Sequence, residues 1–305
     1  MKTRLLPAPC ALALLLALSG CATPDQLAHV HSFSAAAGSY ATQARDAFTR
    51  INDLSVERKL SEVALKAQPL EEGDFTGLLD TDERLATRLQ ALAALGAYAA
   101  ALDGVASADN RAAVSQSSAA LYAALVSARD DAQKLTGQGA GLTDADLGLV
   151  ATAVKALGGA VTEARRAEAL RTIVTRTDPA IQALCAALAA DFHASVGSFK
   201  SMTDSVFTDQ FDAYRRAAAG LGYDASLTRL RTLRTAYLAR AHAADFLENL
   251  SQAALALAKA HAAVRDSFTQ PSQDPAELVR AIGQLKAYAD DIRAFHASLN
   301  SSGHE

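Results

Sequence analysis

The histidines and carboxylates of this chain are the first residues to test for chemistry, because these groups carry most proton transfers and bind metal ions. The chain has seven histidines and 33 acidic residues. No glutamate is followed by a histidine three positions later, so the motif of di-iron helical bundles is absent. The His-Glu-x-x-His motif of zinc proteases is also absent, and His242 with Asp245 supplies too few ligands for zinc. The sequence therefore predicts no metal site.

Candidate nucleophiles are also few. Neither the Gly-x-Ser-x-Gly motif nor the Ser-x-x-Lys motif of familiar serine enzymes occurs. Cys185 lies in an apolar run, where a lone cysteine is more often a small buried hydrophobe than a nucleophile. His261 lies in an apolar seam, and we interpret it as hydrogen-bonded at the edge of a bundle, with a proton switch as the alternative. These patterns predict that the protein is not an enzyme.

The N-terminal residues have the features of an export signal. Lys2 and Arg4 give a positive start, residues 10–18 are almost entirely alanine and leucine, and small residues precede Cys21. A transmembrane helix needs about 20 apolar residues, and this run is too short. We therefore expect residues 1–20 to be a signal peptide that is removed.

Leu18-Ser19-Gly20-Cys21 resembles the lipobox of bacterial lipoproteins, and the resemblance extends no further along the chain. It implies that the signal peptidase recognises Leu18, Ser19 and Gly20, and that Cys21 receives diacylglycerol and a further acyl group such as palmitate. Several acyl chains, at ~0.8 kcal/mol per buried CH₂, anchor a protein without a spanning helix. Ala22 replaces the aspartate that favours the inner membrane, so the resemblance implies the outer membrane, facing the periplasm. A plain secreted form is the alternative.

Length and charge limit the number of domains and the kinds of partner that the mature chain can have. Removal of residues 1–20 from the 305-residue chain leaves residues 21–305, enough for one large or two modest domains. The loss of Lys2 and Arg4 takes the formal net charge from −4 to −6. A mildly acidic chain has no general attraction for nucleic acid. Cys185 is the one cysteine left besides Cys21, so we expect no disulfide framework within the chain.

The fold class follows from proline and alanine. Beyond the signal, prolines occur only at positions 24, 69, 179, 271 and 275, and proline suits the first turn of a helix or the loop beside it. The chain between them is rich in alanine, the best helix former, and shows no period-two alternation. The sequence therefore predicts an all-α protein.

Apolar residues at heptad spacing predict an elongated, mainly antiparallel bundle of about seven helices with coiled-coil-like packing. The expected helices run over residues 23–69, from about 80–83 to 104–110, 110–136, 143–176, 178–221, 224–268 and from 274–275 to 299. Pro179 is expected to start the fifth helix. It is also the best candidate boundary between two sub-bundles, residues 21–177 and 178–305.

Two polar clusters remain. The longest predicted loop, residues 69–80, surrounds Phe75, Leu78 and Leu79 with acidic residues. We hypothesise that these three apolar residues contact a partner, and the alternative is that they cover the end of the protein's own bundle. Residues 215–240 contain six arginines and one acid. We expect these arginines to bury their stems and pair with neighbouring acids, with a phosphate-binding or lipid-binding patch as the alternative.

Together these features predict a lipid-anchored periplasmic interaction module, that is, a scaffold, an adaptor or an immunity-type binding protein. Its expected partners are the membrane, through the anchor, and another envelope protein. No nucleic acid, metal or cofactor is expected apart from the covalent lipid on Cys21. The alternatives are a cell-envelope enzyme with an unrecognised site and a carrier of an apolar ligand between helices.

Overall fold

The computed structural model of the protein describes residues 24–76, 83–136, 143–157, 162–270 and 274–300. Within these ranges the chain forms seven α-helices, two short 3₁₀ helices and no strand, so the predicted all-α fold is confirmed. The elements are α1 (Pro24–Lys66), η1 (Glu72–Phe75), α3 (Glu83–Ser107), α4 (Arg111–Thr136), α5 (Asp144–Ala156), α6 (Glu163–Ala217), η2 (Ala218–Gly220), α7 (Tyr223–Thr269) and α8 (Pro275–Asn300).

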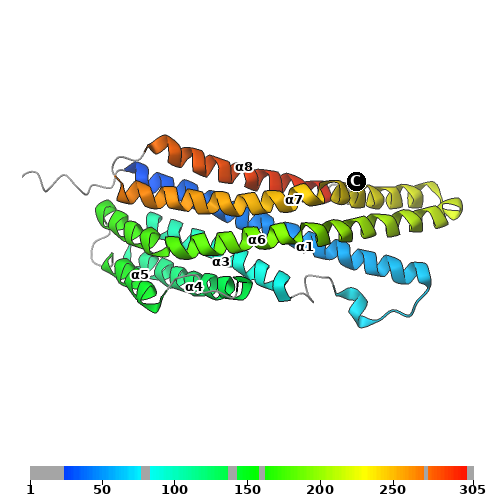
Figure 1. Ribbon diagram of the computed structural model, residues 1–305, viewed down its shortest axis with the longest axis horizontal. Helices are drawn as coiled ribbons and strands as arrows, with labels where there is room; N and C mark the ends of the chain where they lie inside the picture. The colour runs from blue at the N-terminus through cyan, green and yellow to red at the C-terminus, as the bar shows by residue number, and fades with distance from the viewer. Residues whose placement is uncertain (1–23, 77–82, 137–142, 158–161, 271–273, 301–305) are drawn as a thin grey trace, which may run out of the picture.

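The molecule is an elongated bundle organised around its two longest helices. Figure 1 shows α6 and α7 running antiparallel along its length and joining at η2, at one end. α8 packs on α7, and α1 lies against α3, α6, α7 and α8. The shorter helices α4 and α5 pack against α6 in the half of the molecule away from η2. The pair α6–α7 extends beyond the end of α8 at the η2 end (Figure 1).

Side-chain caps begin several helices where the sequence predicts them. Thr143 and Asp146 form a reciprocal capping box at the start of α5, with hydrogen bonds of 3.1 and 3.2 Å between each side chain and the other's backbone N–H. The Asp274 carboxylate accepts a 2.9 Å hydrogen bond from the Ala276 N–H at the start of α8. These bonds satisfy N–H groups that have no partner within the helix, which fixes where each helix begins.

One main hydrophobic core runs through all seven α-helices. Its largest fully buried side chains include Phe33, Tyr40, Tyr98 and Phe192. Alanine is the commonest residue at the remaining buried positions, and small side chains allow the helix axes to approach closely. The heptad pattern that predicts a bundle runs along the first helix as a seam, and its first part is buried: Phe33, Ala37, Tyr40, Ala44, Ala47, Ile51 and Leu54. The predicted continuation of the seam is not buried, because Leu60 and Val63 are partly exposed and Ala67 is exposed.

The predicted helix start at Pro179 is wrong, because α6 continues through this residue from Glu163 to Ala217. A proline inside a helix costs about 3 kcal/mol, since it lacks an N–H and crowds the preceding turn. Ile173 and Ile181 are both fully buried, so a break between them would expose core on either side. Burial of this face outweighs the local cost of proline. The main hydrophobic core contains residues from both sides of position 178, the expected limit between sub-bundles.

The helix break in this region lies earlier than predicted. α5 ends at Ala156 and α6 begins at Glu163, instead of one helix running over residues 143–176. The Thr162 side chain caps α6 by accepting a 3.4 Å hydrogen bond from the Arg165 N–H. In the sequence, Gly158-Gly159, a pair of poor helix formers, stands between Ala156 and Glu163, outside the described residues.

Among the described residues, the segments Ala86–Ser107 and Glu163–Gly220 contain windows that are long and apolar enough to cross a membrane. In these windows 56% and 50% of the residues are buried inside the bundle. Burial against other helices accounts for their apolar character, as in the core helices of any bundle.

Candidate functional site

The predicted lipidation residues, Leu18, Ser19, Gly20 and Cys21, lie outside the described residues. The lipid attachment at Cys21 therefore stays a prediction from sequence.

The predicted contact loop is described as far as residue 76, so Leu78 and Leu79 also lie outside the described ranges. Phe75 ends η1 and is 56% exposed, so its ring does not cover the core of the bundle. The Lys59 ammonium ties η1 to α1, because its Nζ donates to the carbonyl oxygens of Gly73 (3.2 Å) and Thr76 (2.8 Å). Phe75 is thus held on the surface, where the hypothesis of a partner contact requires it.

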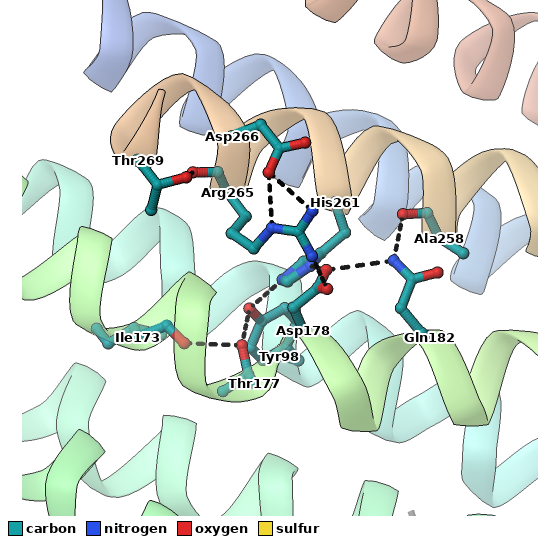
Figure 2. A network of polar contacts seen from close by, with 10 residues as sticks. All are labelled: Tyr98, Ile173, Thr177, Asp178, Gln182, Ala258, His261, Arg265, Asp266 and Thr269. Atoms are coloured by element: carbon teal, nitrogen blue, oxygen red, sulfur yellow. Dashed lines mark hydrogen bonds and ion pairs between the residues drawn. The ribbon is translucent and has the colours of Figure 1, made fainter. Parts of the chain in front are cut away.

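The densest group of polar side chains surrounds His261 and joins α3, α6 and α7 (Figure 2). Nε2 of His261 lies 2.7 Å from the hydroxyl of Tyr98, and Nδ1 lies 2.9 Å from Oδ1 of Asp178. The Tyr98 hydroxyl also lies 2.9 Å from Oγ1 of Thr177. His261 is completely buried. It is hydrogen-bonded as predicted, but it lies in the core and not at the edge of the bundle.

Asp178 is the charged centre of this network. Its carboxylate pairs with the guanidinium of Arg265 and accepts a 3.2 Å hydrogen bond from Nε2 of Gln182. Burial by itself raises the pKa of Asp178, but the hydrogen bonds from His261 and Gln182 and the charge of Arg265 lower the pKa by more. The carboxylate therefore stays ionised in the core, where its partners compensate for the loss of hydration.

The neighbouring acidic groups, a phenol and a thiol, stay protonated. Burial raises the pKa of Tyr98 and the pKa of Cys185, and the nearby charge of Asp178 raises both further. Cys185 is a free cysteine with no exposed surface, so its interpretation as a small buried hydrophobe is confirmed. A buried thiol with a raised pKa is a poor nucleophile, because the thiolate is the reactive form.

The tyrosine, histidine and aspartate lie in a row that could pass a proton, but their setting favours a structural role. Tyr98 and Thr177 are almost completely buried, as His261 is, so no substrate reaches these groups in this conformation. The hydrogen bonds satisfy polar groups from three helices at once. Such a network fixes the register of α3, α6 and α7 relative to one another.

A second buried ion pair links α3 to α6. Nη2 of Arg88 donates to Oδ1 of Asp191 (2.9 Å) and to Oγ of Ser195 (2.7 Å), and Nε of Arg88 contacts the other carboxylate oxygen. Both charged side chains are buried. The arrangement satisfies the guanidinium fork and the carboxylate together, which is the condition for tolerating a charge pair in a core.

The described residues contain no group of three or more His, Cys, Asp and Glu side chains that could hold a metal ion. His242 and Asp245, the weak candidates from sequence, are exposed and line a surface groove between α7 and α8.

An exposed aromatic cluster lies at the η2 end of the molecule. We call residues 204–240, the last part of α6, η2 and the first part of α7, the distal hairpin. The rings of Phe207 and Phe211 stack at 5.8 Å, and Tyr237 meets Phe207 edge-on at 6.0 Å. The guanidinium of Arg240 lies 5.0 Å from the Phe207 ring, and that of Arg215 lies 5.9 Å from the Phe211 ring. The rings and arginines form one surface across both helices.

This surface is open to solvent. Phe211 is 40% exposed and Tyr237 is 54% exposed. Tyr223 and Leu230 on the same hairpin are also exposed. The prediction that the arginines pair with neighbouring acids holds for Arg240, whose Nε donates to Oδ1 of Asp204 at 2.7 Å.

Reasoning from sequence missed both the aromatic cluster and the partners of His261. Phe207 and Phe211 are four residues apart, which places them on one helix face, but the pattern does not say whether that face is covered. Tyr98 and Asp178 lie 163 and 83 residues from His261, and no local spacing relates them. Comparison with protein-family models, curated proteins and solved structures finds no match to this chain.

Proposed function

We propose that this protein is a lipid-anchored interaction module of the cell envelope, and that the distal hairpin is its contact surface for another envelope protein. The observation that carries the proposal is the cluster of Phe207, Phe211 and Tyr237 with its two arginines, in which Phe211 and Tyr237 are exposed. Aromatic residues and arginine dominate the energetic hot spots of protein interfaces. The rings already contact one another, so little side-chain entropy is lost when a partner covers them.

Charge indicates the kind of partner. The distal hairpin carries six arginines and four aspartates, an excess of positive charge on a chain whose net charge is negative. An acidic surface on the partner would complement this region, speed the encounter and disfavour basic competitors. We therefore expect the contacted surface to combine acidic residues with an apolar patch.

The position of the hairpin suits this function. α1 begins at one end of the molecule, and the distal hairpin lies at the other end (Figure 1). The 43 residues of α1 span ~65 Å at 1.5 Å per residue. Cys21 precedes the first residue of α1 by three positions. If Cys21 carries lipid, this geometry would hold the aromatic surface tens of ångströms from the membrane, within reach of other envelope proteins.

Site-specific photocrosslinking tests the proposal. A photoreactive phenylalanine replaces Tyr237 in the full-length lipoprotein, expressed in a bacterial envelope. Replacement of Tyr122 on α4 is the matched control, because this tyrosine is 49% exposed but lies outside the distal hairpin. We expect a discrete adduct with an envelope protein from position 237 and not from position 122. Equal adducts from both positions, or none from position 237, would contradict the proposal.

A further inference from the structure

A groove between the end of α1 and the distal hairpin has the features of a ligand site. Its volume is about 480 Å³, which lies within the range of ~300–1,000 Å³ that is usual for ligand pockets. Residues of α1, α6 and α7 line it, so three helices fix its shape.

Gln210 of α6 is the first sign that the groove takes a ligand. Its side chain lines the groove and is only 8% exposed. The amide oxygen Oε1 is buried and accepts no hydrogen bond within the described part of the chain. An unpaired buried acceptor costs roughly 1–3 kcal/mol, so a donor from outside the chain would relieve this cost. The groove therefore calls for an N–H or O–H group on its occupant.

Two arginines supply the charge of the groove. Arg216 comes from α6 and Arg229 from α7, and both line the groove and are exposed. Neither guanidinium has a carboxylate partner among the described residues. The planar guanidinium fork matches a carboxylate with two parallel hydrogen bonds. The groove therefore favours a carboxylate on its occupant.

The remaining lining combines apolar side chains with hydroxyl groups. Ala64 and Leu65 of α1 and Ala213 of α6 supply an apolar wall, and the hydroxyl groups belong to Ser61, Tyr214 and Thr232. An apolar side chain placed there would remove hydrocarbon surface from water on both sides. The occupant that fits all three features carries a carboxylate, an N–H group and an apolar side chain close together.

We infer that this groove binds the carboxy-terminal residue of a partner polypeptide. That residue has its main-chain carboxylate for Arg216 and Arg229, its amide N–H for Oε1 of Gln210, and a side chain for the apolar wall. Capture of a chain terminus in this way is an established mode of peptide recognition. A phosphate or sulfate ion fits less well. Its charge can pair with the arginines, but it has no apolar group to contact the apolar wall. The inference rests on the proposed function and names the part of the partner that the groove takes.

Peptide binding to the full-length lipoprotein in detergent micelles tests the inference. The probe is the fluorescein-labelled peptide Gly-Gly-Gly-Ala-Leu with a free carboxylate, and its control is the same peptide with a carboxy-terminal amide. We expect fluorescence anisotropy to give a dissociation constant for the free acid about tenfold lower than for the amide, the equivalent of one charge-assisted contact. Equal affinities, or no binding of the free acid at millimolar concentration, would overturn the inference.

Two variants and a matched control test whether the peptide binds in the groove. Arg229→Ala and Gln210→Leu should each weaken binding of the free acid about fivefold or more. Arg234→Ala is the matched control, because Arg234 is an exposed arginine of α7 that does not line the groove, and it should bind as the wild type does. Equal losses in Arg229→Ala and Arg234→Ala would indicate general charge attraction and overturn the assignment. Gln210→Leu removes an unpaired acceptor, so it should keep or raise the melting temperature while it weakens binding.

Competition and crosslinking distinguish a polypeptide terminus from an inorganic anion and the groove from the aromatic surface. N-acetyl-leucine carries the carboxylate, amide N–H and apolar side chain of a terminal residue, so it should compete with the pentapeptide. Competition by inorganic phosphate but not by N-acetyl-leucine would assign the groove to an inorganic anion and overturn the inference. A photocrosslink from position 237 without peptide binding would support the proposed function and overturn this inference alone. Peptide binding without that crosslink would support the groove and contradict the role of the aromatic surface.

Discussion

Nδ1 of His261 lies 2.9 Å from Oδ1 of Asp178, although 83 residues separate the two along the chain. This hydrogen bond joins α7 to α6 in the middle of the core, and the opposite ring nitrogen extends the link to Tyr98 of α3. Three helices are thus held in register by one imidazole. Removal of that ring leaves polar groups buried without their partner, which is among the costly changes in a core.

We predict that His261→Leu lowers the free energy of unfolding by about 2–4 kcal/mol. Leucine fills much of the space of the imidazole with an apolar group, but the change removes two buried hydrogen bonds, one of them to a charged group. Urea unfolding followed by circular dichroism measures the change. His193→Leu is the control, since His193 is exposed and lies 3.4 Å from the Glu248 carboxylate. This variant should stay within about 0.5 kcal/mol of the wild type. Similar losses in both variants would contradict a special role for His261.

Acid should destabilise the protein partly through Asp178. The pKa of this carboxyl group is lower in the folded protein than its ordinary value of about 3.9, because its hydrogen bonds and Arg265 outweigh burial. A lowered pKa gives stability that is present above about pH 4 and is lost as the pH falls through the folded pKa. Unfolding free energies measured at several pH values below 5 should therefore fall less steeply in Asp178→Asn than in the wild type. Parallel curves would show that other carboxyl groups account for the acid sensitivity.

Removal of one side chain of the ion pair Arg88–Asp191 should lower the free energy of unfolding more than replacement of both side chains. Arg88→Leu removes the guanidinium that pairs with the buried Asp191 carboxylate, so we expect a loss of about 3–5 kcal/mol. The double variant Arg88→Leu/Asp191→Leu removes both charges and should recover most of this loss. Chemical unfolding of both single variants and the double variant gives the coupling energy. Additive losses would mean that the two charges do not stabilise each other.

Phe75→Ala should leave stability within about 0.5 kcal/mol of the wild type, because the ring is 56% exposed. Phe192→Ala is the matched control, since Phe192 is fully buried and its truncation should cost about 3–5 kcal/mol. Thermal unfolding measures both. If Phe75 contacts a partner, its truncation should also reduce capture of that partner. A large loss of stability in Phe75→Ala would favour the alternative that this loop covers the bundle.

Cys21→Ser should abolish lipidation, because the hydroxyl group of serine does not replace the thiol that receives diacylglycerol. Radiolabelled palmitate should enter the wild-type protein and not the variant, and processing after Gly20 should stop. Cys185→Ser is the control, since that thiol is buried and should leave labelling unchanged. Label in Cys21→Ser would contradict the lipoprotein prediction.

The sequence by itself determined the fold class, most helix limits and the buried face of α1 as far as Leu54. Helix propensity, capping and heptad spacing act over a few residues, so Thr143, Asp274 and the seam from Phe33 to Leu54 could be assigned without any tertiary contact. The motif from Leu18 to Cys21 is local in the same way, and the lipid attachment that it implies stays a prediction.

Only the tertiary structure decided the features that depend on distant neighbours. Pro179 stays inside α6 because the core buries the residues on both sides of it. The free energy of that burial comes from other helices, so it cannot be read from the residues next to the proline in sequence. His261 finds Tyr98 and Asp178 on two other helices. The distal hairpin keeps its rings exposed where α6 and α7 extend beyond α8 (Figure 1). Local interactions set each helix, but packing between helices sets which polar groups meet and which apolar groups stay open to a partner.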